Sequence, residues 1–436
     1  MLFKGKKVVI YGLGKSGSSV ARKLAGLGAK VLISDGKTKD KFAPGLISEL
    51  QALGADFEFA GHTAGAITGA DLIVLSPGVH LDLPVLEEAA RTGIQIISEI
   101  ELACQFLTKP LIAITGTNGK TTTTTLIGEM LKAAGKSIAV AGNIGLPLIE
   151  IDDKGLDYIV VEISSYQLEG SRAFHPHISV ILNIQPDHLE RHHTMTEYIK
   201  QKTKIFLNQT GDDYLVFNEA DPQVAAMVAG ASAKLIGFDQ QRANEIITLK
   251  PEEIKIPGRH NLENALAAAQ VAYLCGVKKE IVAQVLKHFP GVEHRIEYVD
   301  TINGVEYRND SKGTNPDSTM VALETFAGRG IVLILGGKDK GVDLMPLVNK
   351  IKSLVRHVIL LGEAAPLFAA TLRQNGYQHY SEVGYSLAKA VALASQLSRA
   401  GEVVLFSPAC ASFDMFNNYE ERGKMFKELC QKLKIK

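Results

Sequence analysis

The stretch LIAITGTNGKTTTTTLIGEM, residues 111–130, decides the fold of the central part of the chain. A short apolar run leads into a glycine-containing loop and then into a segment of helical character. This order is typical of a phosphate-binding loop with the pattern G-x-x-x-x-G-K-[ST]. Counted back from Gly119-Lys120-Thr121, the first glycine of that pattern should fall at position 114, where the chain has Ile114.

The remaining features of this loop still predict phosphate binding. Gly116 and Gly119 allow the loop to curl, and the helix that follows points its N-terminus at the same place. Lys120 is then placed for the β- and γ-phosphates of a nucleotide, and Thr121 for a Mg²⁺ ion. A Gly-Lys-Thr helix start without a ligand is the alternative.

A second motif near the N-terminus also predicts a nucleotide. GLGKSG, residues 12–17, follows the apolar run KKVVIYG and opens a helix, and Asp35 ends the next apolar run. This spacing is typical of a dinucleotide-binding turn, in which the acid holds a ribose hydroxyl. The glycines bring the backbone close to a diphosphate, which any nucleotide diphosphate satisfies. An NAD-dependent dehydrogenase and a tight turn without ligand both stay open at this point.

Composition indicates a globular protein. The 436 residues predict about three domains, and hydrophobic and charged residues make up 46% and 22% of the chain. Since 47 basic residues balance 47 acidic ones, a nucleic-acid protein held by a basic surface is not expected. The four cysteines form no C-x-x-C pair, and no apolar run reaches the length of a membrane span. We expect a cytoplasmic protein with reduced thiols and no membrane insertion.

Recurrent apolar runs predict an α/β fold with parallel sheets. Runs such as KKVVIYG, AKVLIS, DLIVLS, YIVVEI, ISVILN and EVVLFS are apolar on both faces and are separated by helical patterns. They group into three units, with boundaries near residues 98 and 298.

Three further residues point to chemistry in the central unit. Glu162 ends an apolar run, at the strand end where open parallel sheets bind ligands, and His188 follows the next such run as a possible metal ligand. Lys202 shares an apolar helical stripe with Tyr198 and Ile205. Burial would lower the pKa of its amine, so that it could take up CO₂ as a carbamate; a snorkelling lysine is the alternative. His192 and His193 are expected to be an exposed pair.

TGTNGKTTTT resembles the ATP loop of the Mur ligase superfamily, whose loop also lacks the first glycine, and further motifs extend the resemblance over the whole chain. The resemblance implies a Rossmann-like UDP-substrate domain at 1–98, a central ATP-binding domain with a P-loop-type parallel sheet at 99–298, and a Rossmann-like amino-acid-binding domain at 299–436. It implies ATP and two Mg²⁺ ions as cofactors, with a carbamate on Lys202.

The same resemblance assigns roles to residues of this sequence. For ATP it implies Gly116, Thr117, Asn118, Gly119, Lys120, Thr121, Thr122, Asn264, Arg295, Asp310 and Lys312. For Mg²⁺ it implies Thr121, Glu162, His188 and Lys202, and for catalysis Lys120, His188 and Lys202. For the UDP-linked and amino-acid substrates it implies Lys15, Ser16, Asp35, Gly36, Lys37, Ser76, Gly78, Asn143, Ser164, Gln167, Thr314, Lys340, Ser412 and Tyr419.

The implied activity is the ATP-dependent addition of D-glutamate to UDP-N-acetylmuramoyl-L-alanine by a monomer, through an acyl phosphate. The acidic-Asn-Pro-Arg signature of the members that add diaminopimelate or lysine is missing. Tyr419 departs from the family, whose best-known members have Phe here. Three alternatives remain: a Mur-type ligase that adds another amino acid, an NAD-dependent dehydrogenase, and a nucleotide-binding scaffold that uses no amino-acid acceptor.

Overall fold

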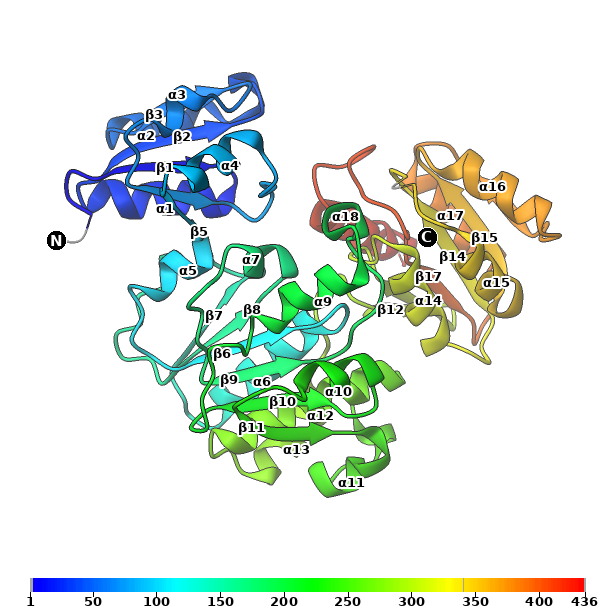
Figure 1. The fold of residues 1–436 in the computed structure, drawn as a ribbon. Helices are drawn as coiled ribbons and strands as arrows, with labels where there is room; N and C mark the ends of the chain where they lie inside the picture. Colours follow the sequence, from blue (N-terminus) through cyan, green and yellow to red (C-terminus); the bar gives the residue numbers. More distant parts are fainter. Residues whose placement is uncertain (1–2, 340, 435–436) are drawn as a thin grey trace. The chain divides into compact units, whose positions relative to one another are not determined.

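The computed structural model describes residues 3–339 and 341–434, and contacts divide the chain into two compact units. The first contains Met1–Lys250 with Glu263–Val285, and the second contains Pro251–Leu262 with Leu286–Lys436. The described residues form two sheets in the first unit and one in the second (Figure 1). The predicted α/β class with three sheet-based parts is confirmed, whereas the bounds at residues 98 and 298 stay a prediction.

The first sheet is parallel and five-stranded. In spatial order its strands are β3 (Asp56–Phe59), β2 (Lys30–Asp35), β1 (Lys7–Tyr11), β4 (Leu72–Leu75) and β5 (Gln95–Ser98). Its helices are α1 (Lys15–Gly26), α2 (Pro44–Ala52), α3 (Ala64–Ile67) and α4 (Pro84–Arg91). Val8 and Ile10 pack into one buried cluster and Val9 and Tyr11 into another, because both faces of a parallel sheet are covered. The strand order reverses beside β1, where such sheets bind ligands.

The second sheet is parallel and six-stranded. In spatial order its strands are β11 (Lys234–Phe238), β10 (Tyr214–Asn218), β9 (Ile178–Ile181), β6 (Leu111–Thr115), β8 (Tyr158–Glu162) and β7 (Ile138–Gly142). The helices of this region are α5 (Glu99–Cys104), α6 (Lys120–Ala133), α7 (Ser165–Glu169), α8 (Leu189–His192), α9 (Met195–Thr203), α10 (Pro222–Val228), α11 (Ala243–Ile246), α12 (Arg259–Leu274) and α13 (Lys279–His288). The predicted strand β6 lies in the middle, so its loop opens at the centre of the sheet edge.

The third sheet is mixed. In spatial order its strands are β12 (Glu297–Ile302), β13 (Val305–Asn309), β17 (Val403–Phe406), β14 (Ile331–Gly336), β15 (Val355–Leu361) and β16 (Tyr380–Glu382). Its helices are α14 (Pro316–Thr325), α15 (Met345–Leu354), α16 (Ala365–Gln374), α17 (Leu387–Leu397) and α18 (Tyr419–Leu433). The β12–β13 pair is antiparallel, because the two-residue turn Asn303-Gly304 has positive φ at both positions and leaves no room for a crossover helix.

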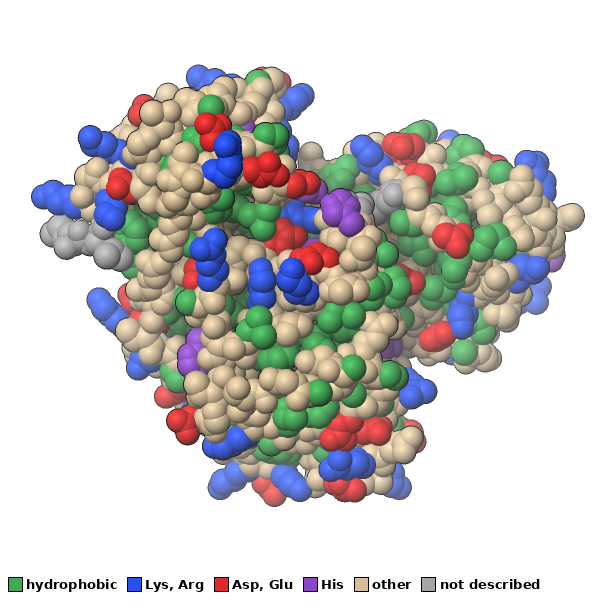
Figure 2. Space-filling view, viewed as in Figure 1, with side chains coloured by type: hydrophobic (Ala, Val, Ile, Leu, Met, Phe, Trp, Pro, Cys, Tyr) green, Lys and Arg blue, Asp and Glu red, His purple; other side chains and the backbone are tan. Residues whose placement is uncertain are grey.

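Short 3-10 turns connect several elements: η1 (Lys39–Lys41), η2 (Leu148–Glu150), η3 (Gln240–Arg242) and η4 (Pro251–Glu253). None of the helices in the described ranges is long and apolar enough to cross a membrane. Lys and Arg side chains are interspersed with Asp and Glu on the face shown in Figure 2, in keeping with the equal numbers of the two charges.

Candidate active site

The phosphate-binding loop joins β6 to α6. Ile114 is fully buried and pairs with Glu162 of β8, so the position of the expected glycine is a core residue of the sheet. The loop therefore starts only at Gly116. Gly119 has a φ of 85°, and a Cβ on it would lie 2.2 Å from Asn264 Oδ1. Only glycine fits there without displacing a neighbour.

Lys120 is the first residue of α6 and folds back over the loop. Its ammonium donates hydrogen bonds of 2.8 Å to the carbonyl oxygens of Gly116 and Thr117. The loop thus curls around a positive charge at a helix N-terminus, an arrangement that attracts phosphate oxygens. Thr121 and Thr122 are buried in the first turn of the same helix.

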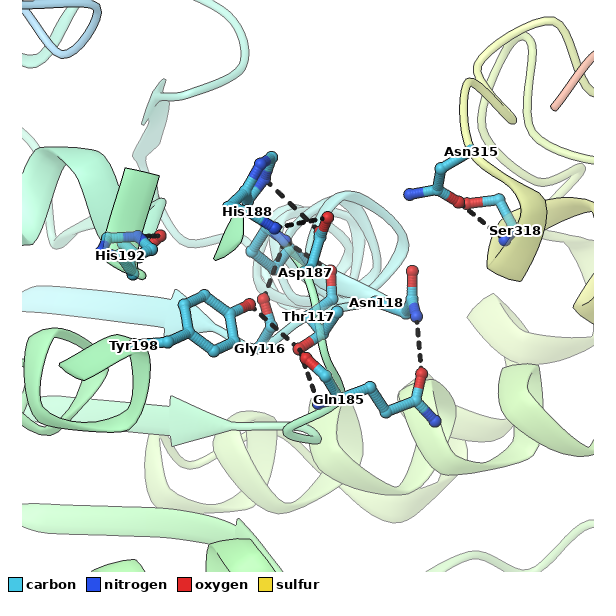
Figure 3. A network of polar contacts seen from close by, with 12 residues as sticks. Gly116, Thr117, Asn118, Gln185, Asp187, His188, His192, Tyr198, Asn315 and Ser318 are labelled. Carbon is cyan, nitrogen blue, oxygen red and sulfur yellow. Dashed lines mark hydrogen bonds and ion pairs between the residues drawn. The ribbon is translucent and has the colours of Figure 1, made fainter. Parts of the chain in front are cut away.

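Side chains that follow β9 hold the loop in place (Figure 3). Thr117 Oγ1 accepts a hydrogen bond of 2.9 Å from the Gln185 backbone N–H and lies 3.0 Å from the Tyr198 hydroxyl. Asn118 donates its backbone N–H to Asn183 Oδ1 at 2.8 Å and its amide to Gln185 Oε1 at 3.0 Å. Sequence reasoning missed Asn183 and Gln185 as parts of the site, although they follow the strand end that had drawn attention to His188.

Among the described residues, only one of the two carboxylate oxygens of Glu162 has a hydrogen-bond partner. Asn143 donates its amide to Glu162 Oε1 at 2.7 Å, while Oε2 is buried and has no hydrogen-bond partner among the described residues. Over the same residues, no group of three or more His, Cys, Asp or Glu could hold a metal by itself. Mg²⁺ usually binds through one or two carboxylates together with substrate phosphates, so a buried unpaired oxygen beside the loop fits that ion.

Lys202 lies on α9 with its side chain 1% exposed. Its amine donates to the Gly116 carbonyl at 2.9 Å and lies 3.3 Å from Thr115 Oγ1 and 4.8 Å from the Tyr198 ring centre. Burial lowers the pKa of Lys202 well below its ordinary value, and the charge of Lys120 lowers it further. The site therefore favours a neutral amine, which is nucleophilic toward CO₂.

His188 follows β9, as the sequence predicts, and Asp187 directly precedes it. His188 has a φ of 56° and immediately precedes α8. Its Nε2 lies 3.4 Å from Asp187 Oδ2, and its ring centre lies 4.8 Å from that of Tyr166. The exposed part of this imidazole remains accessible to a ligand.

The prediction of an exposed histidine pair is wrong for His192 and holds for His193. His192 is 3% exposed, and one of its ring nitrogens lies 2.9 Å from Ser165 Oγ. The reason is that α8 turns this face toward α7 and α9, where the His192 ring packs between Tyr166 and Tyr198.

Ser164 and Gln167 bond to each other in the structure. Ser164 Oγ accepts the Gln167 backbone N–H at 3.3 Å, and Gln167 Oε1 accepts the Ser164 backbone N–H at 3.0 Å. This reciprocal arrangement is a capping box that fixes the start of α7. Their predicted role in substrate binding remains a prediction.

A cavity of about 610 Å³ opens at the carboxyl ends of β1, β2 and β4. All seven residues predicted to border the UDP group line it: Lys15, Ser16, Asp35, Gly36, Lys37, Ser76 and Gly78. A Cβ on Gly17, the third glycine of the motif, would lie 1.9 Å from the Gly12 carbonyl oxygen, so close packing of α1 on the strand requires glycine.

Asp35 is oriented by the backbone of this cavity. Its Oδ2 accepts the Leu13 N–H at 2.6 Å and its Oδ1 accepts the Lys37 N–H at 2.9 Å. The carboxylate therefore braces the glycine-rich turn while keeping lone pairs for a ligand. Sequence reasoning missed His62, which lines the same cavity.

The second unit gathers the residues predicted to act from the C-terminal domain. Asp310 is buried, and its Oδ2 accepts a hydrogen bond of 2.6 Å from Ser407 Oγ. Burial raises the pKa of Asp310 to about 7. The hydrogen bond from Ser407 and the charge of Arg295 lower this pKa, but burial has the larger effect. The Lys312 ammonium lies 5.4 Å from the Tyr419 ring centre. Arg295 lines a cavity of about 350 Å³.

The other predictions in this unit have mixed outcomes. Ser412 is buried, and the Thr314 backbone N–H donates to the Lys312 carbonyl at 2.9 Å. Asn315 caps α14 by accepting the Ser318 N–H (Figure 3). Pro316 occupies the first helical position and places the cap before it. Lys340 lies outside the described residues.

Two buried residues of the second unit carried no sequence signal. The Arg422 guanidinium donates to the Ser311 carbonyl at 2.7 Å and to the Cys410 carbonyl at 3.1 Å, tying α18 to the loops after β13 and β17. The imidazole of His294 lies 2.9 Å from the Asn309 amide. Both depend on contacts between distant segments.

A phosphate-binding loop beside a buried carboxylate and a buried lysine, together with a second nucleotide-type cavity, defines a nucleotide-dependent α/β enzyme. Residues 6–98 match the family model described as Mur ligase MurD-like, N-terminal domain. Residues 114–272 match the Mur ligase middle domain, and residues 294–410 match the Mur ligase, glutamate ligase domain. The chain belongs to the Mur ligase family.

Named relatives cover the whole chain. The UDP-N-acetylmuramoylalanine–D-glutamate ligase of Pelotomaculum thermopropionicum is 42% identical over 99% of both chains, and that of Clostridioides difficile is 41% identical over 100% of both. Among solved structures, a UDP-N-acetylmuramate-alanine ligase from Thermotoga maritima has a TM-score of 0.59 at 22% identity, covering 98% of this chain and 99% of that one. A MurF from Acinetobacter baumannii has a TM-score of 0.60 at 17% identity, covering 100% and 91%. These two likenesses show the fold.

Proposed function

We propose that this chain is an ATP-dependent ligase that joins D-glutamate to UDP-N-acetylmuramoyl-L-alanine in the synthesis of peptidoglycan precursors. The observation that carries the proposal is the full-length similarity, at 41–44% identity, to ligases of that name. Three features of the central sheet support the proposal: the loop around Lys120, the Glu162 oxygen that has no partner among the described residues, and the buried amine of Lys202.

In the first proposed step a substrate carboxylate oxygen attacks the γ-phosphorus of ATP, giving an acyl phosphate and ADP. Lys120 neutralises negative charge that moves between the phosphate oxygens, and the N-terminus of α6 adds a partial positive charge. Gly116, Thr117, Asn118, Gly119 and Thr122 supply the loop around the phosphates.

We further propose that Thr121, Glu162, His188 and the carbamate of Lys202 hold two Mg²⁺ ions. Bound Mg²⁺ supplies charge neutralisation to the transferring phosphoryl group. Glu162 fits this role because its buried Oε2 has no partner among the described residues, and Asn143 fixes its orientation through Oε1.

The carbamate would form when the neutral amine of Lys202 attacks CO₂ and releases a proton, which turns a buried neutral group into an anion. The buried amine, with its lowered pKa and with Lys120 nearby, supports this proposal. ¹³C-bicarbonate should give a carbamate carbon signal that Lys202→Ala lacks. The same variant should lose turnover and regain part of it with short carboxylates. Full activity of the Lys202→Ala variant without added carboxylates would contradict the proposed carbamate.

In the second proposed step the amine of D-glutamate attacks the acyl carbon, and phosphate leaves to give the amide. We propose that the second unit orients this amino acid through Thr314, Lys340, Ser412 and Tyr419. An acyl phosphate hydrolyses in water, so this unit would also have to exclude water.

The remaining proposed contacts concern the nucleotides. Asn264 would meet the adenine, and Arg295, Asp310 and Lys312 would approach ATP from the C-terminal side. The UDP group would occupy the cavity lined by Lys15, Ser16, Asp35, Gly36, Lys37, Ser76 and Gly78, while Asn143, Ser164 and Gln167 would border the rest of that substrate. We propose a cytoplasmic monomer.

Phosphate release tests the function. With ATP and UDP-N-acetylmuramoyl-L-alanine, D-glutamate should give release, whereas L-lysine and diaminopimelate should not. Phosphate release with L-lysine or diaminopimelate would instead indicate that the chain adds that amino acid. Tight NADH binding without ATP turnover would indicate the dehydrogenase, and equal ATP hydrolysis with and without D-glutamate would indicate a nucleotide-binding scaffold.

A further inference from the structure

Helix α8 has only four residues, Leu189–His192, and starts directly after His188. The residues on either side of it, His188 and His193, have φ values of 56° and 62°, a region that non-glycine residues adopt rarely. A single helical turn is not stable by itself, because the first turn of a helix is costly to form. The side chains that anchor α8 therefore decide where His188 lies.

The Arg191 side chain anchors α8 to α7. It is 6% exposed and forms an ion pair with Glu169, the last residue of α7, whose side chain is 9% exposed. The guanidinium donates from Nε to Glu169 Oε1 and Oε2 at 2.9 and 3.1 Å, and from Nη2 to Oε2 at 2.5 Å. Forked hydrogen bonds between charged groups fix both distance and orientation, so α8 is held firmly against the end of α7.

The same guanidinium supports the aromatic ring against which His188 packs. Its central carbon lies 4.6 Å from the centre of the Tyr166 ring, and the centre of the His188 ring lies 4.8 Å from that of Tyr166. Tyr166 belongs to α7, as does Glu169. Arg191 therefore acts on His188 by two routes, one through the backbone of α8 and one through the ring of Tyr166.

A further hydrogen bond joins Arg191 to the nucleotide cavity of the first sheet. Its Nη2 donates to the Val79 carbonyl at 2.7 Å, and Val79 lines that cavity. The turn that contains Val79 has supports of its own, because Ser76 donates its backbone N–H to the Tyr11 carbonyl and its hydroxyl to the Gly12 carbonyl, each at 3.0 Å. The wall of the cavity thus has its own hydrogen bonds, and Arg191 connects this wall to α8.

The proposed first step brings a substrate from the cavity to ATP at the phosphate-binding loop, so its rate depends on how these two sites are placed. We propose that Arg191 is a positioning residue, which fixes His188 relative to the wall of the nucleotide cavity so that the carboxylate of the bound substrate meets the γ-phosphate. The inference rests on the proposed function for the identity of that substrate. It adds a residue that acts through His188 and Val79, because its own side chain is buried.

Two variants of the full chain test the inference. Arg191→Lys keeps the charge beside Glu169 but has no fork that could bond Glu169 and Val79 together. A double variant, Arg191→Met with Glu169→Leu, removes both charges, so that neither is left buried and unpaired and the chain should fold.

The first readout is the separation of turnover from binding. With saturating ATP, D-glutamate and UDP-N-acetylmuramoyl-L-alanine, both variants should form ADP with a kcat about 10²-fold below wild type, the cost of a displacement of about 1 Å. The Kd values of UDP and of ATP, measured by calorimetry, should remain those of the wild type, because the cavity wall and the phosphate-binding loop keep their own hydrogen bonds.

Arg356→Lys is the matched control. Arg356 also donates to one carboxylate and one backbone carbonyl, namely Glu402 Oε2 at 2.8 Å and the Leu397 oxygen at 2.6 Å, but it belongs to β15 of the third sheet. Its replacement removes a fork of the same kind and should leave kcat unchanged.

The second readout needs no turnover. In an NMR spectrum of histidine-labelled protein, the ring signals of His188, assigned with His188→Gln, carry a shift from the nearby Tyr166 ring. These signals should move in Arg191→Lys and stay in place in Arg356→Lys.

Any of four results would overturn the inference: a wild-type kcat in a folded Arg191 variant, a Kd of UDP that rises as much as kcat falls, an equal loss of kcat in Arg356→Lys, or unchanged His188 signals in Arg191→Lys. A wild-type chain that forms no ADP from these substrates would refute the proposed function instead. The His188 signals would then still decide whether Arg191 positions that ring.

Discussion

Glu99 is a buried carboxyl group that should make the stability of the chain depend on pH. It is the first residue of α5 and is 1% exposed. Its Oε1 accepts the Ile149 backbone N–H at 2.9 Å, and its Oε2 is buried with no hydrogen-bond partner among the described residues. Burial raises the pKa of Glu99 to about 7. The replacement Glu99→Gln removes the charge and keeps an oxygen for Ile149.

The magnitude follows from the two pKa values. The ordinary value is 4.5 and the folded value about 7, so ionisation of Glu99 costs the folded state about 3 kcal/mol above pH 8, at about 1.4 kcal/mol per pKa unit. Because the folded carboxyl holds its proton more tightly, its contribution to stability is greatest below pH 4.5. That contribution is lost as the pH rises through 7. Between pH 5.5 and 8.5 the loss is about 2 kcal/mol.

The assay is urea unfolding of wild type and Glu99→Gln at pH 5.5 and 8.5. Relative to wild type, the variant should gain about 2 kcal/mol on going from the lower to the higher pH. The change with pH is the readout, because an unpaired amide N–H₂ in the variant adds a cost that does not depend on pH. A change with pH is also the appropriate quantity for a chain of several domains, because a single absolute free energy of unfolding is not defined for such a chain.

Glu87→Gln is the control, since Glu87 is exposed on α4 and its loss changes the net charge by the same amount. A Glu99→Gln variant whose stability difference from wild type is the same at both pH values would refute the reasoning. So would a control that behaves like the test variant.

Three further outcomes are expected. Gly119→Ala should weaken ATP binding at least tenfold in calorimetry, because its φ of 85° costs an L-residue about 1–2 kcal/mol and its Cβ would displace Asn264 Oδ1; unchanged binding would contradict the loop geometry. Lys120→Met should lower phosphate release by about 10²–10³-fold while the melting temperature without ATP changes little, and a retained rate would exclude Lys120 from the chemistry. Tyr419→Phe keeps the ring beside Lys312 and should leave kcat/KM within about twofold, whereas a larger loss would give the hydroxyl a role.

Local patterns predicted the central elements correctly. The apolar runs that became β1, β4, β6, β8 and β9 are buried on both faces, and such strands carry the strongest signal because apolar residues occupy most of their positions on both faces. Edge strands gave little signal. Strand β3 reads DFEF and β16 reads YSE, so neither has a continuous apolar run.

Motifs predicted the positions of the loop and of the first nucleotide turn, but not the contacts that complete them. Thr117 follows from the motif, whereas its partners Gln185 and Tyr198 come from β9 and α9. Similarly, Glu162 could be selected as a strand-end acid. The sequence did not show that Asn143 bonds its Oε1 and that its Oε2 has no partner among the described residues. These hydrogen bonds join segments that are far apart in the sequence, so a local motif does not predict them.

The same reasoning explains why an intact motif can be less informative than an incomplete one. Position 114 has no glycine because Ile114 is a strand residue that pairs with Glu162 in the middle of the sheet. The loop is therefore shorter, but it keeps the residues from Gly116 onward. The complete GLGKSG motif specifies a diphosphate and nothing about the base. His62 also lines this cavity. It contacts Ser34, whose partner Glu58 is set by the register of β2 against β3, and no motif encodes that register. The lining of the cavity therefore depends on strand pairing, and a one-residue shift of β3 against β2 would break these contacts while leaving every glycine in place.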